Sequence, residues 1–143
     1  DDPAAGLDTV ARRDFLWAAL DVAREEGKAV LFTSHVLTDV ERVADTVAFV
    51  REGRVALTGE LDDLKLRLRR IVVPGAARTS SQIAVPGEVA RRTERDALVV
   101  VTEDPSGDVA DRLSAHWTGV TSEALSLEEL FIEVLGDDGS GAA

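Results

Sequence analysis

The first third of the chain holds one long amphipathic block and one short apolar block. From Thr9 to Gly27, apolar side chains recur at helical spacing and charged side chains mostly take the other positions. This pattern predicts a helix that begins near Thr9 and ends at the glycine. Ala29 to Phe32 is then continuously apolar, which is typical of a parallel strand covered on both faces. The two blocks predict a helix that packs on a sheet.

A second helix and a hairpin are expected after this strand. The helix runs through about Ala44; Thr38 and Glu41 have the spacing of a capping box, and the alternative is a helix that starts a few residues earlier. Residues 46–50 and 54–57 then favour two short strands with a Glu-Gly pair between them, which predicts a hairpin. Helices and strands that alternate in this way are expected in an α/β fold.

The second half of the chain predicts a smaller α+β domain. Residues 60–70 favour a charged helix, and residues 71–82, which include Pro, Gly, Thr and Ser, predict a linker. The elements expected beyond it are strands at 82–85, 97–102 and 119–123 and helices at 106–116 and 127–135. The expected division is therefore residues 1–70, a linker at 71–82, an accessory domain at 83–135, and a disordered tail at 136–143.

The composition of the 143 residues excludes several classes of protein. The chain has no cysteine, so a disulfide framework and a thiolate metal site are both excluded. Its net charge of −11 argues against a nucleic-acid partner, because phosphate backbones are held mainly by Lys and Arg. The basic cluster from Lys65 to Arg70 lies on a predicted helix and is interpreted as a solvated face. No apolar run approaches the roughly 20 residues that a membrane-spanning helix needs.

Carboxylates gather at the start of the sequence. Asp1 and Asp2 are adjacent, a Pro-Ala-Ala-Gly turn follows, and Asp8 stands where the first helix should begin. Carboxylates on a loop suit a hard cation such as Mg²⁺, which takes oxygen ligands and often binds phosphate groups at the same time. Asp8 is also a favoured residue type for the N-cap of that helix. The opening residues therefore point to phosphate chemistry.

Three stretches, in the same order along the chain, resemble ABC transporter ATPases. Asp1-Asp2 and Gly6-Leu7-Asp8 resemble the end of the Walker B strand and the D-loop of that family. Thr33-Ser34-His35, directly after the apolar run, looks like the family's switch strand with its switch histidine. Residues 45–55 are similar to the family's closing hairpin. Three ordered matches within about the first sixty residues make the resemblance specific, whereas one match alone would be weak.

The resemblance implies a role for each candidate residue. Asp1 would hold Mg²⁺ near the β- and γ-phosphates of ATP, and Asp2 would orient the attacking water. His35, with Ser34 beside it, would contact the γ-phosphate, and Asp8 would communicate across a dimer while it caps its helix. Asp2 stands where the family has the longer Glu. Withdrawing a carboxylate by roughly 1 Å can cost on the order of a hundredfold in rate, so slow hydrolysis, or hydrolysis through a repositioned loop, is expected.

Each of these residues also has a structural interpretation. The alternative for Asp1 is a terminal carboxylate without a function. The alternative for His35 is a side chain that caps or packs beside the next helix, which is the usual fate of a lone histidine. His116, next to Trp117, matches no motif and is expected at the surface or in a partial core.

The sequence lacks the phosphate-cradling half of a nucleotide site. No G-x-x-x-x-G-K-[ST] motif is present, and the one Gly-Lys pair, Gly27-Lys28, is interpreted as a helix stop. The family's Q-loop and signature motif are absent as well, and the sequence contains no methionine. We therefore expect a C-terminal fragment that starts at the end of Walker B and is inactive on its own.

The resemblance implies the C-terminal part of a P-loop-type ATPase core, with a parallel sheet and helices, followed by a small α+β accessory domain. Such a subunit binds and hydrolyses ATP with Mg²⁺, pairs head to tail with a second ATPase subunit, and drives a transmembrane permease from the cytoplasmic face of the cell membrane. Residues 125–131 resemble the terminal helix of the accessory domain in the drug-exporter-like branch, which implies export.

Two other readings stay open at this point. One is a non-catalytic interaction or regulatory piece, a truncated or degenerate relative that kept the fold and lost the chemistry. It is motivated by Asp2 in place of Glu and by the missing phosphate-binding loop. The other is an unrelated α/β domain that binds a small molecule, for which the ordered matches would be chance.

Overall fold

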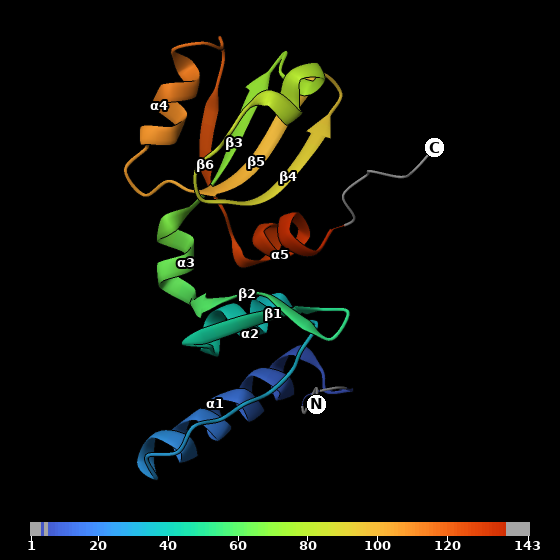
Figure 1. Ribbon diagram of the computed structural model, residues 1–143. Helices are drawn as coiled ribbons and strands as arrows, with labels where there is room; N and C mark the ends of the chain where they lie inside the picture. Colours follow the sequence, from blue (N-terminus) through green and yellow to red (C-terminus); the bar gives the residue numbers. More distant parts are fainter. Residues whose placement is uncertain (1–3, 5, 137–143) are drawn as a thin grey trace. The chain divides into compact units, whose positions relative to one another are not determined.

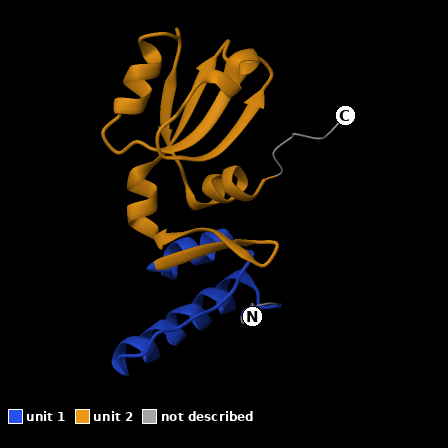
Figure 2. Ribbon diagram, in the orientation of Figure 1, with its two compact units in different colours: residues 1–45 blue, residues 46–143 orange. Residues whose placement is uncertain are grey.

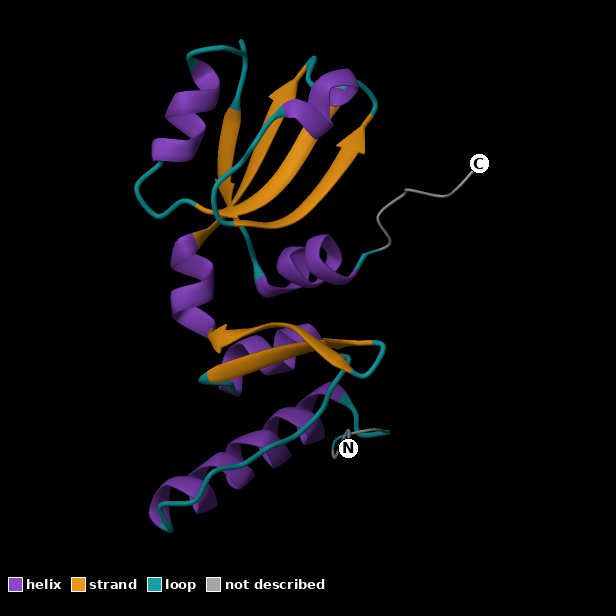
Figure 3. Cartoon of the chain, in the orientation of Figure 1, coloured by secondary structure: helices purple, strands orange, loops and turns teal. Residues whose placement is uncertain are grey.

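The fold is mixed α/β, as the sequence predicts. The computed structural model describes residue 4 and residues 6–136, so Asp1, Asp2 and most of the predicted tail lie outside the described residues. The chain divides into two compact units, residues 1–45 and residues 46–143 (Figure 2). Figure 1 labels their helices and strands, and Figure 3 colours them by type. Among the described helices, none is both long and apolar enough to cross a membrane.

The first unit contains two helices, α1 (Thr9–Glu25) and α2 (Leu37–Val43). The predicted end of α1 at Gly27 is confirmed, because this glycine has φ +61°, a left-handed conformation that costs glycine little. The Gly27 N–H donates to Arg24 O at 3.3 Å, and the Lys28 N–H donates to Ala23 O at 2.8 Å. These two bonds form a Schellman motif, which satisfies carbonyls that the helix end would otherwise leave without partners.

The strand predicted at Ala29–Phe32 is wrong for the described structure. The segment between α1 and α2 joins no sheet, and the strands of the described residues pair only in antiparallel fashion. Leu31 is 97% exposed and Val30 is 48% exposed. A parallel strand requires hydrogen-bonded neighbours, and none of the described residues provides one for this segment. The apolar run therefore has the composition of a buried strand without the sheet that would bury it.

The helix α2 begins differently from the prediction. Its first residue is Leu37 and its N-cap is Val36, which makes no side-chain capping bond. Thr38 thus lies inside the helix, so the capping box predicted for Thr38 and Glu41 is wrong. Ser34 orders this entrance instead, because its Oγ accepts a hydrogen bond from the Val36 N–H at 3.0 Å.

The second unit begins with the predicted hairpin, which is confirmed. The strands β1 (Thr46–Arg51) and β2 (Arg54–Glu60) pair in antiparallel register. The turn residues Glu52 and Gly53 both have positive φ, 52° and 74°, as a two-residue type I′ turn requires. Val47 and Phe49 are buried on one face of β1.

A four-stranded antiparallel sheet forms the body of the second unit. The helix α3 (Leu61–Arg67) leads directly into the first strand of this sheet. The strands are β3 (Leu68–Pro74), β4 (Glu88–Glu94), β5 (Ala97–Glu103) and β6 (Thr121–Ala124). Their order across the sheet is β4-β5-β3-β6. The strands predicted at 97–102 and 119–123 are confirmed in kind, with bounds that differ by a few residues.

Two elements of this unit differ from the sequence prediction. Residues 71–82, expected as a linker, contain the end of β3 and the 3-10 helix η1 (Ala77–Gln82). The strand predicted at 82–85 is not formed, and β4 lies further on instead. The strand β4 reads Glu-Val-Ala-Arg-Arg-Thr-Glu, which has little intrinsic strand preference. Its conformation comes from pairing along β5, an example of tertiary context that overrides propensity.

The core of the sheet lies on one of its faces. Ile71, Val73, Leu98 and Val100 are fully buried there, and residues of the helix α4 (Asp108–Ser114) pack against them. Asp104, itself 3% exposed, accepts hydrogen bonds from the N–H groups of Val109 at 3.0 Å and Ala110 at 3.1 Å. This carboxylate thereby caps α4 from the end of β5, so the predicted helix at 106–116 is confirmed in a shorter form.

The terminal helix α5 (Leu127–Leu135) occupies the residues predicted for it. Ser126 and Glu129 form a capping box at its start, with both reciprocal bonds present. The helix contacts β1, β2 and β4, and Phe131 meets Phe49 edge to face with ring centroids 5.8 Å apart. The helix α5 therefore joins the hairpin to the four-stranded sheet within the second unit.

Candidate functional site

Asp8 begins α1 as its N-cap, which confirms the structural part of its predicted role. Its Oδ1 accepts hydrogen bonds from the N–H groups of Val10 and Ala11, both at 2.9 Å. These bonds satisfy two of the four N–H groups that a helix start leaves without partners. The turn before it bends at Gly6, where φ is +80°. The carboxylate of Asp8 is exposed, so its second oxygen faces a region that solvent can reach.

Ser34 and His35 lie together at the entrance to α2. The bond from the Val36 N–H to Ser34 Oγ folds the chain back at this point, and such turns are made by serine hydroxyls beside the backbone. His35 follows immediately, in a bend, and its side chain is exposed. The arrangement places a histidine at the end of the extended apolar segment, on a backbone that Ser34 holds.

An ion pair between the two helices of this unit was not predicted. Arg12 on α1 lies 3.7 Å from Asp39 on α2, measured from Nη1 to Oδ2. The carboxylate of Asp39 is buried, and its Oδ2 has no hydrogen-bond partner among the described residues. A buried charge strongly needs its counter-charge, so Arg12 helps to fix α2, and with it the preceding His35 segment, to α1. Helical spacing had placed Arg12 on the polar side, and nothing in the sequence marks Asp39.

Only part of the predicted phosphate site lies among the described residues. Asp1, the predicted magnesium ligand, and Asp2, the predicted catalytic carboxylate, lie outside them. Within residue 4 and residues 6–136, no three His, Asp or Glu side chains gather to hold a metal ion. His35 is the described group best suited to face a phosphate, because a histidine can donate a hydrogen bond to it. The fit to Mg²⁺ and ATP is therefore partial.

The basic cluster from Lys65 to Arg70 is not one solvated helix face. The helix α3 ends at Arg67, and Leu68 to Arg70 belong to β3. Arg67 donates to Asp63 Oδ2 and to Glu103 Oε1, each at 2.7 Å. Two of the positive charges of this cluster, Arg67 and Arg70, are thus paired with carboxylates of the same chain.

Arg70 and Arg92 hold α5 on the sheet, together with the glutamates of that helix. Arg92 binds Glu133 in a bidentate fashion: its Nε donates to Oε2 at 2.9 Å and its Nη2 donates to Oε1 at 3.0 Å. Arg70 lies 3.4 Å from Glu129 and 3.6 Å from Glu133. The Glu133 side chain is only 5% exposed. We call these four residues, Arg70, Arg92, Glu129 and Glu133, the α5 clamp.

Ion pairs and hydrogen bonds shift the pKa values of three residues of the clamp toward the charged form. The Glu133 and Glu94 carboxylates, both hydrogen-bonded to Arg92, raise the pKa of that guanidinium. The hydrogen bond to Glu123 raises the pKa of Arg70 in the same way. The backbone and side chain of Ser126 hold the pKa of Glu129 below its ordinary value. Arg70, Arg92 and Glu129 therefore stay ionised throughout the neutral range.

Most of these contacts carry no signal in a single sequence. Arg70 and Glu133 are far apart along the chain, and they meet only because α5 packs against the four-stranded sheet. The Ser-x-x-Glu spacing at Ser126 is the exception, since it marks the helix start directly. His116 was expected at the surface or in a partial core, and it is exposed, with Nδ1 3.2 Å from Arg112 O.

Comparison with known proteins links the chain to ABC transporters. YtrB of Bacillus subtilis (strain 168), an ABC transporter ATP-binding protein, is 35% identical over 65 residues, which are 46% of this chain and 22% of YtrB. The energy-coupling factor transporter ATP-binding protein EcfA2 of Lacticaseibacillus paracasei is 30% identical over 92 residues, 61% of this chain and 32% of EcfA2.

The name of a third relative states a direction of transport, which is import. The thiamine import ATP-binding protein ThiQ of Vibrio parahaemolyticus is 39% identical over 64 residues, 45% of this chain and 27% of ThiQ. The chain thus spans about a third or less of each of these relatives. No family model matches the chain. Several ABC transporter ATP-binding proteins match part of it at modest identity, which supports the ABC ATPase family.

Proposed function

We propose that this chain is the C-terminal part of the ATP-binding, ATP-hydrolysing subunit of an ABC transporter, from the end of Walker B onward. The observation that carries the proposal is the placement of His35. It stands exposed at the end of an extended apolar segment, ordered by Ser34 and followed at once by a helix. The ordered sequence matches at Asp1-Asp2, Asp8 and residues 45–55, together with the partial matches to relatives, support the same conclusion.

The proposed roles follow the chemistry of each side chain. Bound Mg²⁺ neutralises phosphate charge; Asp1 is its proposed ligand. Asp2 orients the attacking water as a hydrogen-bond acceptor. His35 donates a hydrogen bond to the γ-phosphate, and Ser34 holds the backbone that carries it. Asp8 keeps one carboxylate oxygen on its own helix, while the other is proposed to meet the second ATPase subunit in a head-to-tail dimer.

The proposed setting is the cytoplasmic face of the cell membrane, where the subunit is peripheral and acts through a transmembrane permease. Residues 1–70 are proposed as the ATPase part and residues 83–135 as the accessory part. Export is the proposed direction, on the resemblance of residues 125–131 to the terminal helix of drug-exporter-like ATPases. An import protein among the relatives means that this direction rests on the accessory part alone.

A second candidate function is a non-catalytic interaction or regulatory piece of the same fold. Two observations favour it, namely Asp2 in place of the longer Glu and the absence of a phosphate-binding loop from the 143 residues. Under this alternative the four-stranded sheet and α5 carry the interaction or regulatory function. The residues that match the ATPase motifs then have no catalytic role.

Turnover of ATP by the whole subunit that carries this chain, with and without Mg²⁺, separates the two candidates. The proposal predicts Mg²⁺-dependent hydrolysis that Asp2→Asn abolishes, with ATP binding unchanged, because the amide has lost the basicity needed to polarise water. Glu26→Gln, an exposed substitution after α1, serves as the control and should hydrolyse normally. A subunit that binds ATP without hydrolysing it would support the non-catalytic alternative. Loss of both binding and turnover in Asp2→Asn would assign that residue a structural role.

A further inference from the structure

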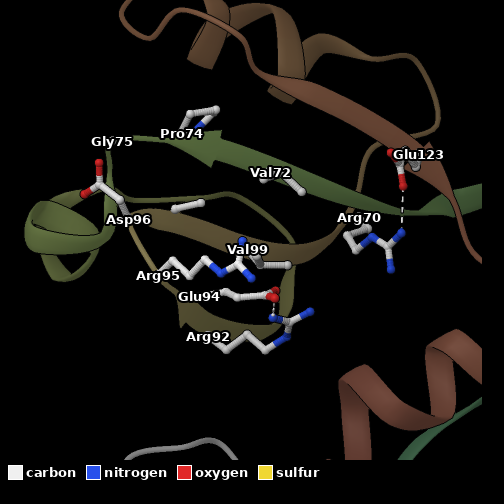
Figure 4. A pocket seen from close by; sticks show the side chains of 11 residues that line it. Arg70, Val72, Pro74, Gly75, Arg92, Glu94, Arg95, Asp96, Val99 and Glu123 are labelled. Carbon is white, nitrogen blue, oxygen red and sulfur yellow. Dashed lines mark hydrogen bonds and ion pairs between the residues drawn. The ribbon is translucent and has the colours of Figure 1, made fainter.

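The face of the four-stranded sheet opposite the α4 core carries a shallow depression of about 530 Å³ (Figure 4). Successive residues of a strand point to opposite faces, so Val72 and Val99 face away from the buried Ile71 and Val100. Val72 and Val99 are cross-strand partners in β3 and β5, and Pro74 and Ala97 form the next pair. These four side chains give the depression an apolar floor.

Six charged side chains surround this floor, three of each sign. They are Arg70, Arg92, Arg95, Glu94, Asp96 and Glu123. Two of the guanidinium groups already bind carboxylates of the chain. Arg70 donates to Glu123 at 2.6 Å, and Arg92 donates to Glu94 at 2.6 Å and to Glu133 of α5. The carboxylates of Glu94 and Glu123 are therefore paired as well. The two charged residues without such a pair among those lining the depression are Arg95 and Asp96, in the turn between β4 and β5.

Arg95 differs from the other two arginines. Within the part of the chain that the structure describes, its guanidinium makes no hydrogen bond or ion pair. Its backbone has φ +52°, and in Figure 4 its side chain extends from the turn toward Val99, over the floor. The Asp96 carboxylate points toward Gly75 in the same view, away from Arg95. The depression thus combines an apolar floor with one guanidinium that makes no hydrogen bond or ion pair with the described residues, although it lies close enough to Glu94 to help lower the pKa of that carboxyl.

We propose that this depression binds a small organic monoanion with an apolar body, such as an aromatic or branched-chain carboxylate. The body lies on Val72 and Ala97, with the buried Val99 beneath them, and the carboxylate meets the guanidinium of Arg95. An apolar site with a few placed polar groups is the usual form of a small-molecule pocket, and a guanidinium can bind a carboxylate through two parallel hydrogen bonds. Nothing in this inference depends on the proposed nucleotide chemistry.

The charges of the depression select against other ligands. Arg70 and Arg92 are paired with Glu123 and Glu94, and Asp96 points away toward Gly75 (Figure 4), so Arg95 is the charged group placed to meet one negative charge on the ligand. A polyanion such as a phosphate ester would bring excess charge close to Glu94 and Asp96, where like charges repel. The arginines bound to glutamates form fixed walls, so little ordering is needed when a ligand enters.

A titration with benzoate, followed by the backbone amide signals of the whole 143-residue chain in NMR spectra, tests this inference. The amide signals of residues 72, 73, 75 and 95–99 are expected to shift in a saturable way; Pro74 has no N–H and gives no signal. Benzyl alcohol and benzylamine, which present the same ring without the negative charge, are expected to bind at least tenfold more weakly, the effect of losing one charge-assisted hydrogen bond.

Two single-residue variants test whether Arg95 is the group that binds the carboxylate. Arg95→Asn is expected to raise the Kd for benzoate about tenfold or more, and asparagine tolerates the positive φ of this turn position. Arg112→Gln on α4, an exposed arginine that does not line the depression, is the matched control and should bind as the unaltered chain does. Shifts that never saturate, equal binding of benzylamine and benzoate, or an unchanged Kd in a folded Arg95→Asn would each overturn the proposal.

Discussion

Two apolar runs look alike in the sequence and have opposite fates in the structure. Ala29–Phe32 is extended and joins no sheet, with Leu31 97% exposed. The run within β5 pairs with β3 on one side and β4 on the other, and its Leu98 and Val100 are fully buried. Composition gives both runs the capacity to form a strand. Only the run within β5 forms a strand, because hydrogen-bonded partner strands lie on both of its edges.

The same contrast separates the polar residues of the two units. In the second unit, four charged side chains form the α5 clamp and hold a helix on the sheet, and in the first unit Arg12 and Asp39 join the two helices. In the first unit, His35 and the second oxygen of Asp8 are exposed, and the apolar segment beside His35 is not covered by described residues. The exposed His35 and the uncovered apolar segment beside it are the features on which the proposed composite site rests.

The largest expected effect compares the two apolar runs directly. Leu98→Ala should lower the free energy of unfolding by about 2–5 kcal/mol, because it opens a cavity in a fully buried position. Leu31→Ala should change it by no more than about 0.5 kcal/mol, because the side chain is already in water. Urea unfolding of the two variants measures both. Equal losses would mean that Leu31 is buried in solution.

The α5 clamp gives the next largest effect. Glu133→Ala removes the carboxylate that accepts two hydrogen bonds from Arg92, and the free energy of unfolding should fall by about 1–3 kcal/mol. Asp63→Ala breaks a more exposed pair with Arg67 and should cost less than about 1 kcal/mol. If the two variants unfold at the same urea concentration, the clamp is no stronger than a surface ion pair.

The N-cap of α1 should contribute less than the clamp. Asp8→Ala removes both side-chain bonds to the helix start, which should destabilise the helix by about 1 kcal/mol. Amide hydrogen exchange at Val10 and Ala11 should accelerate correspondingly. Asp21→Ala, at an exposed position within the same helix, should leave these amides unchanged. Equal exchange in both variants would show that α1 does not depend on its cap.

The smallest effect expected is a pH dependence at the start of α5. The pKa of Glu129 is lowered in the folded protein by Ser126, so the unfolded chain binds a proton more readily than the folded one. The resulting stabilisation is present above the ordinary glutamate pKa of about 4.3 and is lost as the pH falls through the folded value. Glu129→Gln should reduce the loss of stability in this acid range, whereas Glu128→Gln, its exposed neighbour, should not. Identical acid profiles for the two variants would contradict this account.

The sequence predicted the elements that are coded locally. The hairpin turn at Glu52-Gly53, the helix stop at Gly27 and the capping box at Ser126 each place a residue type at a position that requires it. Predictions failed where distant residues decide the outcome. The strand β4 depends on pairing with β5, and the segment Ala29–Phe32 lacks the partners that its composition assumes.

The candidate site was predictable to the same limited degree. Ser34 and His35 could be singled out because they follow an apolar run, but the hydrogen bond that makes Ser34 a backbone support was not visible in the pattern. The pair Arg12–Asp39 joins residues from two helices and was missed for the same reason as the clamp. Contacts between elements require the fold before they can be named.

ATP turnover of the whole subunit bearing His35→Ala is the measurement to make first. It tests whether the first unit carries the switch histidine of an ATPase site. The matched control is His116→Ala, which changes the one other histidine of the chain, also exposed. The account predicts that turnover falls about a hundredfold in His35→Ala, the usual effect of removing a group that stabilises developing charge, while His116→Ala is unaffected. Turnover in His35→Ala at the rate of the unaltered subunit would contradict it.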